Sequence, residues 1–217
     1  MKHTFLCLVF VLSLLVLQAQ DQENKSSSWG IRLGTNISNQ YDMAEGDSKQ
    51  LFKPCLMGGV FVEYPIGNKM KKEVSISLVE RGAKTDMSYV ENSSGIRIIK
   101  HDTFNVSYLY VSLGMKDRFY IGNHFYYVLG GSAEWGWKGR SSTTMEGTTD
   151  IVNIFEGDND LLQKRWDITI LAGCGFDIGK RINIEYNAAF GLVNLARNNV
   201  ISETHNYGMS LSLGFKF

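Results

Sequence analysis

The sequence predicts an all-β protein: an eight-stranded antiparallel up-and-down transmembrane β-barrel with short periplasmic turns and longer extracellular loops. Three observations lead to this prediction: a secretory leader, connections that alternate between long and short, and strict alternation in the terminal stretch. From residue 207 to the end, every odd position is large and apolar and every even position is small or polar. A period of two is typical of a strand with one apolar and one polar face.

Residues 1–19 are predicted to form a signal peptide, and residues 20–217 the outer-membrane barrel domain. Lys2 supplies the positive charge, residues 5–17 an apolar core, and Leu17-Gln18-Ala19 the cleavage site. The core is shorter than the roughly 20 residues that a membrane-spanning helix needs. The chain is therefore expected to be exported and released from its leader.

Composition favours many strands joined by turns, because the chain has 22 Gly, 2 Pro, 4 Trp, 10 Tyr and 12 Phe. The formal net charge of +0 gives no support for nucleic-acid binding. Beyond the leader only Cys55 and Cys174 remain, too few for a disulfide framework or a metal cluster.

The first two predicted strands are residues 29–37 and 56–66, separated by a polar loop. Their apolar faces, expected to meet lipid, contain Trp29, Ile31, Leu33, Ile37, Val60, Val62 and Tyr64. Gly67 and Asn68 then form a tight turn, since both residue types tolerate positive φ.

Residues 72–85 and 104–117 are the third and fourth predicted strands. Their outward residues are Val74, Ile76, Leu78, Leu109, Val111, Leu113 and Met115. The alternation slips at Val79-Glu80-Arg81, which predicts a β-bulge near the membrane rim. Residues 118–123 are read as a short link to the next strand.

Residues 124–138, 166–178, 181–195 and 206–217 complete the predicted barrel. Their outward apolar sets begin with Phe125, Trp166, Ile182 and Tyr207 and continue at every second residue. The longest loop, residues 139–165, is polar. Gly179-Lys180 is a tight turn, and a last loop lies around residues 198–205.

Four long and three short connections suit a barrel with both chain ends in the periplasm. The aromatic residues agree with two interfacial girdles. One, at the long-loop end, contains Trp135, Trp137 and Trp166; the other contains Trp29, Tyr64, Phe125, Phe176, Phe215 and Phe217. The alternative is a soluble barrel of lipocalin type, whose apolar face would point inward and whose outer face would be crowded with charge.

The inward positions at the turn end carry balanced charges, which predicts an interior plugged by its own side chains. The positive members are Arg32, Lys116, Arg181 and Lys216, and the negative members are Glu63, Glu73, Asp177 and Glu185. Neighbouring strands are expected to pair Arg32 with Glu63 and Lys216 with Glu185. Cys55 and Cys174, at opposite ends and on different sides of the barrel, are expected to be free thiols.

Some residues have types that catalysis or metal binding uses. His101 and His205 lie near predicted extracellular loops, with Asp102, Ser107 and Glu203 close in sequence. An enzyme would need a His, a Ser and an acid at one membrane height, and the spacing here gives no motif. The acidic residues 156–160 lack the Gly and distal Glu of a calcium loop. No catalytic, cofactor or metal site is therefore expected.

The predicted strands resemble the PorT-like outer-membrane β-barrel family of Bacteroidota. The similar stretches are GIRLGTNIS (30–38), GVFVEYPI (59–66), RGAK (81–84), YLYVSL (108–113), YVLGG (127–131) and LSLGFKF (211–217). The chain departs from the family's frequent Pro at Ser112 and frequent Glu at Ser75. The resemblance implies an outer-membrane barrel whose terminal Phe217 is read by the barrel-assembly machinery. The secretion role of the family's named member is not carried across.

Two functional hypotheses follow. The favoured one is a non-enzymatic outer-membrane barrel, structural or partner-binding through its extracellular loops, with a narrow plugged interior. Its expected partners are outer-membrane lipid, the barrel-assembly machinery and a protein at the loops, with no nucleic acid and no cofactor. The other hypothesis is an outer-membrane enzyme acting on lipid or peptide.

Overall fold

The computed structural model describes residues 27–42, 49–93, 96–145, 148–153, 164–195 and 204–217. The predicted signal peptide, residues 1–19, lies outside these ranges. No helix within them is long and apolar enough to cross a membrane.

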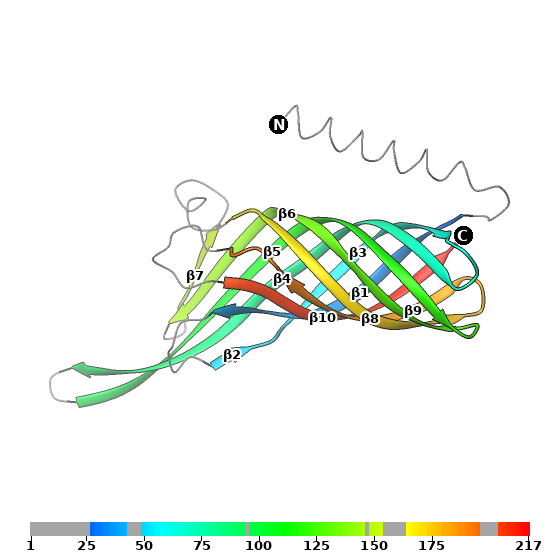
Figure 1. The fold of residues 1–217 in the computed structure, drawn as a ribbon. Coiled ribbons are helices and arrows are strands. Elements are labelled where there is room, and N and C mark those ends of the chain that lie inside the picture. Colours follow the sequence, from blue (N-terminus) through cyan, green and yellow to red (C-terminus); the bar gives the residue numbers. More distant parts are fainter. Residues whose placement is uncertain (1–26, 43–48, 94–95, 146–147, 154–163, 196–203) are drawn as a thin grey trace, which may run out of the picture.

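Eight antiparallel strands close into a ring (Figure 1). In spatial order they are β1 (Ser28–Asp42), β3 (Lys53–Pro65), β4 (Met70–Ser93), β5 (Ile96–Ile121), β6 (Phe125–Met145), β8 (Trp166–Ile178), β9 (Ile182–Gly191) and β10 (Thr204–Lys216). Pairing of β10 with β1 closes the ring, which confirms the predicted eight-stranded barrel. Closure satisfies the backbone of every membrane strand, since lipid offers no partner to an unpaired N–H or C=O.

Two short strands lie outside the ring. β2 (Lys49–Leu51) pairs with β4, and β7 (Thr148–Asn153) pairs with β6. Both fall in segments predicted as loops. They were missed because an added strand in water needs no continuous apolar face, so its sequence carries little alternation.

The outer surface of the ring is apolar, as predicted. Leu33 and Leu129 are 65% and 61% exposed, although both belong to the alternating apolar sets. Trp135 lies directly opposite Trp166 at the loop end, and Phe125 opposite Phe176 at the turn end. Exposed apolar side chains all around the ring exclude the soluble lipocalin-type alternative, in which this face would point inward.

The predicted strand boundaries are too short at the loop end. β4 continues to Ser93 and β5 begins at Ile96, so the loop expected between residues 86 and 103 is a paired ribbon that projects from the barrel (Figure 1). β6 likewise continues to Met145. Apolar alternation stops where the strands leave lipid, while backbone pairing continues into water. In contrast, β9 ends at Gly191, before the predicted residue 195.

The predicted link at residues 118–123 is also wrong, because β5 runs through Arg118 to Ile121. The tight turn itself begins at Gly122, whose φ is 76°. Gly67 and Gly179 open the other two short turns with φ values of 75° and 65°. Each of these glycines directly follows an isoleucine: Ile121 and Ile178 end β5 and β8, and Ile66 lies one residue beyond the end of β3.

The bulge predicted at Val79-Glu80-Arg81 is absent from the described β4–β5 ladder, whose register runs without interruption from Met70 to Ser93. Val79 and Arg81 both point inward and are buried. The register shift lies instead in β6, where Leu109 pairs with Lys138 and Tyr110 with Gly136, leaving Trp137 as the extra residue. The alternation of β4 looks broken in the sequence because Val79, although apolar, faces the interior.

Both predicted free thiols are confirmed. The Cys55 side chain is buried, with its sulfur 3.4 Å from the Ser38 hydroxyl, whereas Cys174 lies on β8 opposite Tyr127 and Tyr186.

Candidate functional site

The barrel interior at the turn end contains eight buried charged residues, here called the interior ion-pair cluster. They are Arg32, Lys116, Arg118, Lys216, Glu63, Glu73, Asp177 and Glu185. Four are cations and four are anions, and the strands that supply them surround the lumen. Balanced charge is needed there, because an unpaired ion in this environment would cost several kcal/mol.

Arg118 is the most connected member of this cluster. Its side chain is fully buried and donates to Glu63 and Glu73, and it lies 3.0 Å from the Glu185 carboxylate. Its guanidinium also lies 5.0 Å from the centroid of the Tyr126 ring. One residue therefore joins carboxylates from three different strands.

The remaining cations complete the network. Arg32 makes a two-pronged contact with Glu73, and its guanidinium lies 4.7 Å from the centroid of the Phe61 ring. Lys216 lies 3.1 Å from Asp177 and 3.3 Å from Glu63. Lys116 contacts Glu185 and lies 3.4 Å from Glu73.

The predicted set of interior charges is largely correct, but two of its details are wrong. Arg181 is exposed in the turn, and Arg118 takes its place in the cluster. The expected pairs Arg32–Glu63 and Lys216–Glu185 are replaced by Arg32–Glu73 and Lys216–Glu63/Asp177. Long side chains in a narrow lumen reach across it, so partners need not lie on neighbouring strands.

A second polar layer lies nearer the loop end. Arg81 makes two hydrogen bonds of 2.7 Å with the Glu134 carboxylate. Asn206 donates to Asp167 at 3.0 Å and accepts from Gln40 at 3.3 Å. All five of these side chains are buried inside the barrel.

Between the two layers lies a cavity of about 90 Å³. Its lining is rich in hydroxyl groups, from Ser75, Ser77, Ser112, Ser132, Ser210 and Ser212. A cavity of this size and polarity suits a few water molecules rather than a substrate. The interior therefore resembles a packed core that contains one small pocket among the described residues, which supports the predicted plug.

The residues considered for catalysis do not come together. Ser107 lies on β5 and His205 on β10, and these strands occupy opposite sides of the ring. Ser107 accepts a hydrogen bond from Lys53, and the His205 ring lies 3.1 Å from the Gly191 carbonyl and stacks on Phe190. Asp102 belongs to the projecting ribbon, opposite Met87.

Glu203, the side chain of His101 and the acidic stretch 156–160 lie outside the parts that the structure describes. Within the described residues, no group of three or more His, Cys, Asp or Glu side chains is arranged to hold a metal ion. The glycines Gly173 and Gly175 lie in β8, where an added Cβ would collide with Asn187 and Tyr126 respectively.

The loop end offers a different kind of site, the projecting ribbon of residues 87–93 and 96–102. These two segments pair with each other. On the side of β4, pairing with β2 ends at Asp86, and on the side of β5, pairing with β6 ends at Thr103. Among the strands that the structure describes, none pairs with either outer edge beyond those points.

A closed ring with an apolar belt, a charged interior, tight turns at one end and long strands at the other defines a transmembrane β-barrel. The chain matches the family described as outer membrane protein beta-barrel domain over residues 18–197, and it belongs to that family. It is a protein of the bacterial outer membrane. Among curated proteins, none matches the sequence.

Solved structures of small outer-membrane barrels are similar in fold. Neisserial surface protein A is 10% identical, with 88% of this chain and 99% of that chain covered and a TM-score of 0.45. Ail, the attachment invasion locus protein of Yersinia pestis, solved with the heparin analogue sucrose octasulfate, is 14% identical with the same coverage and TM-score. Outer membrane protein W of E. coli is 12% identical, with 89% and 100% covered and a TM-score of 0.40.

Proposed function

We propose that this chain is a non-enzymatic barrel that binds a partner protein outside the cell through its projecting ribbon. The observation that carries the proposal is the ribbon of residues 87–93 and 96–102, whose two outer edges have no partner among the described strands. We propose in addition that the chain is a PorT-like barrel of Bacteroidota and that its leader, residues 1–19, is cleaved on export.

The ribbon is suited to strand addition. An isolated two-stranded hairpin is marginally stable in water, and an open edge readily pairs with another extended chain. The neighbouring segments already do this within the molecule, because β2 adds to the edge of β4 and β7 to the edge of β6. A partner that supplies an extended segment would continue the same pairing and gain main-chain hydrogen bonds.

The alternative of an outer-membrane enzyme has less support, since Ser107 and His205 lie on opposite sides of the ring. The packed interior also leaves no large cavity between the two polar layers, only about 90 Å³. The charged residues inside are engaged with one another, as a structural plug requires.

The test replaces residues 88–101 by Asn-Gly, which shortens the ribbon but keeps the strands that form the ring. A photo-reactive residue placed at Asp102 in whole cells is expected to give a discrete adduct with another protein in the full-length chain. The shortened variant should lose that adduct while it remains folded in the outer membrane. A probe at Asn68, in a periplasmic turn, is the control position.

The variant His205→Ala addresses the enzyme hypothesis, because His205 lies on β10, outside the ribbon. It is expected to keep the adduct and the growth of the host on envelope-stressing media. An adduct that survives shortening, or a growth defect caused by His205→Ala alone, would contradict the proposal.

A further inference from the structure

The bulge in β6 creates a feature on the outer face of the barrel near the loop end. Because Trp137 is the extra residue, Trp137 and Lys138 are both exposed, whereas the flanking Gly136 and Gly139 are buried. Lys138 lies opposite Leu109, which in turn lies opposite Glu80 on β4. The next outward row contains Ser107, Arg140 and Asn153.

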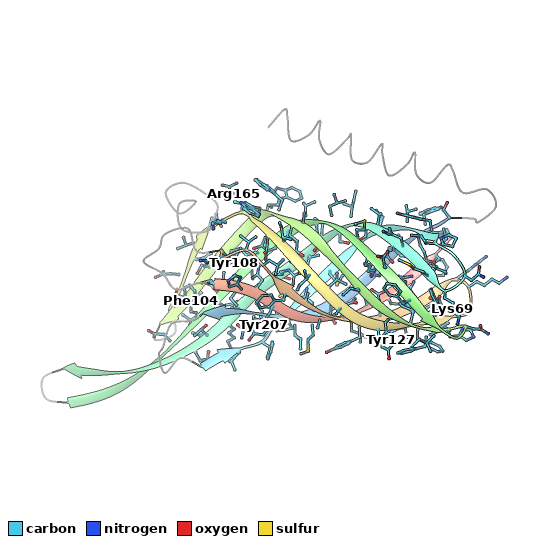
Figure 2. All side chains as sticks on the ribbon, in the orientation of Figure 1. Lys69, Phe104, Tyr108, Tyr127, Arg165 and Tyr207 are labelled. Atoms are coloured by element: carbon cyan, nitrogen blue, oxygen red, sulfur yellow. The ribbon has the colours of Figure 1, made fainter. Side chains whose placement is uncertain are left out.

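These rows line a cleft of about 670 Å³, here called the basic cleft, which Arg165 also lines. Figure 2 places Arg165 at the loop end, far from Lys69 in a short turn. The volume lies within the range of roughly 300–1,000 Å³ that is usual for ligand sites. The interior cavity is far smaller, so the basic cleft is the better candidate for binding a molecule.

The cleft carries an excess of positive charge. Its cations are Lys138, Arg140 and Arg165, against one acid, Glu80, whose carboxylate lies 3.8 Å from the Lys53 ammonium. Within the described residues, neither Lys138 nor Arg140 forms an ion pair. Residues two apart on one strand face are separated by roughly 7 Å, so both cations can approach one anionic group.

The position of the cleft relative to the membrane indicates which kind of ligand it can bind. Trp135 and Trp166 lie side by side at the level expected of an interfacial girdle, and Lys138 and Arg140 follow just beyond it on β6. Leu109 and the Trp137 ring supply apolar surface, and the Lys138 ammonium lies 6.0 Å from the centroid of that ring. Apolar groups below and cations above match the order of acyl chains and phosphates in a lipid.

We propose that the basic cleft binds the phosphorylated head group of an outer-leaflet glycolipid. The phosphate oxygens would accept charge-assisted hydrogen bonds from Lys138 and Arg140, and the sugar and proximal acyl chain would lie against Trp137 and Leu109. This site is separate from the ribbon edges and would fix the orientation of the barrel in the outer leaflet.

The test uses the full chain in phosphatidylcholine nanodiscs that contain a few mole per cent of bisphosphorylated lipid A or its dephosphorylated form. Native mass spectrometry counts the glycolipid retained. The wild type is expected to retain the phosphorylated form, and the double variant Lys138→Gln, Arg140→Gln to bind it roughly tenfold more weakly or worse. The charge-keeping variant Lys138→Arg, Arg140→Lys should retain it.

The matched control is Lys180→Gln, Arg181→Gln, which removes two exposed cations from a turn at the opposite end. Heat-modifiable mobility on gels verifies that each variant is folded. Equal retention by wild type and the Lys138/Arg140 double variant would overturn the proposal. The proposal would also be overturned if the wild type retained the dephosphorylated lipid as well as the phosphorylated one. Complete competition by millimolar inorganic phosphate would assign the site to free phosphate instead.

Discussion

Arg118 shows how much of the interior depends on one side chain. It joins Glu63, Glu73 and Glu185, and no water-exposed surface remains on it. Burying a charge pair gives little net stability compared with apolar packing, yet removal of one partner leaves the others uncompensated. The cluster is therefore expected to respond sharply to single changes.

We expect Arg118→Met to lower the free energy of unfolding by about 3–5 kcal/mol, because three buried carboxylates lose a shared cation. Urea unfolding in lipid vesicles, followed by tryptophan fluorescence, measures this change. Arg181→Met is the matched control, since Arg181 is exposed in a turn and should cost little. Equal stability of the two variants would contradict a central role for Arg118.

The period-two alternation assigned Arg32, Lys116, Lys216 and the four acids to the interior, because the bilayer forces every outward position to be apolar. It could not include Arg118, since the predicted strand stopped at residue 117. The alternation also could not predict which cation pairs with which carboxylate. Which ions meet depends on distances across the lumen, and those follow from the closed ring rather than from neighbouring positions in the chain.

At the scale of elements, β10 completes the barrel. It pairs with β1 from Gly30–Lys216 to Asp42–Thr204 and with β9 on its other side. Its end is anchored by Phe217, whose N–H donates to the Trp29 carbonyl at 2.8 Å. The two rings stack with centroids 4.3 Å apart.

Deletion of Phe217 is expected to reduce insertion strongly, because it removes this closure contact and the aromatic end that the assembly machinery is predicted to read. The amount of heat-modifiable protein in outer-membrane fractions measures the effect. Phe176→Leu, a change in another exposed aromatic of the turn end, is the control and should insert normally. Unchanged insertion after the deletion would refute this role of the terminal residue.

The ribbon and the β6 bulge mark the limit of what alternation can predict. Along residues 87–102 the sequence shows no regular apolar period, so alternation alone could not distinguish the paired ribbon from a loop. The bulge inserts Trp137 as an extra residue in β6. Simple alternation therefore predicts the facing of β6 side chains correctly up to Trp135 but not beyond it. Both features lie where the membrane no longer dictates the pattern, and both belong to the surfaces proposed for binding.

At the scale of the whole molecule, the barrel divides into three levels along its axis. The interior ion-pair cluster fills the turn end, the small hydroxyl-lined cavity lies in the middle, and Arg81–Glu134 with Asp167–Asn206 crosses the lumen nearer the loops. This packed interior agrees with the two proposals that place binding on the outside, at the ribbon edges and in the basic cleft. Eight strands leave an interior only wide enough for side chains.

We therefore expect very little ion conduction. An ion that crossed the lumen would have to displace Arg118 and Arg32 from their carboxylates, and each broken buried pair costs several kcal/mol. Reconstitution in planar bilayers measures conduction directly, with a sixteen-stranded porin prepared in the same detergent as the positive control. Large, stable, open single-channel steps from the folded protein would show that the cluster rearranges into a pore, and would move the function towards transport.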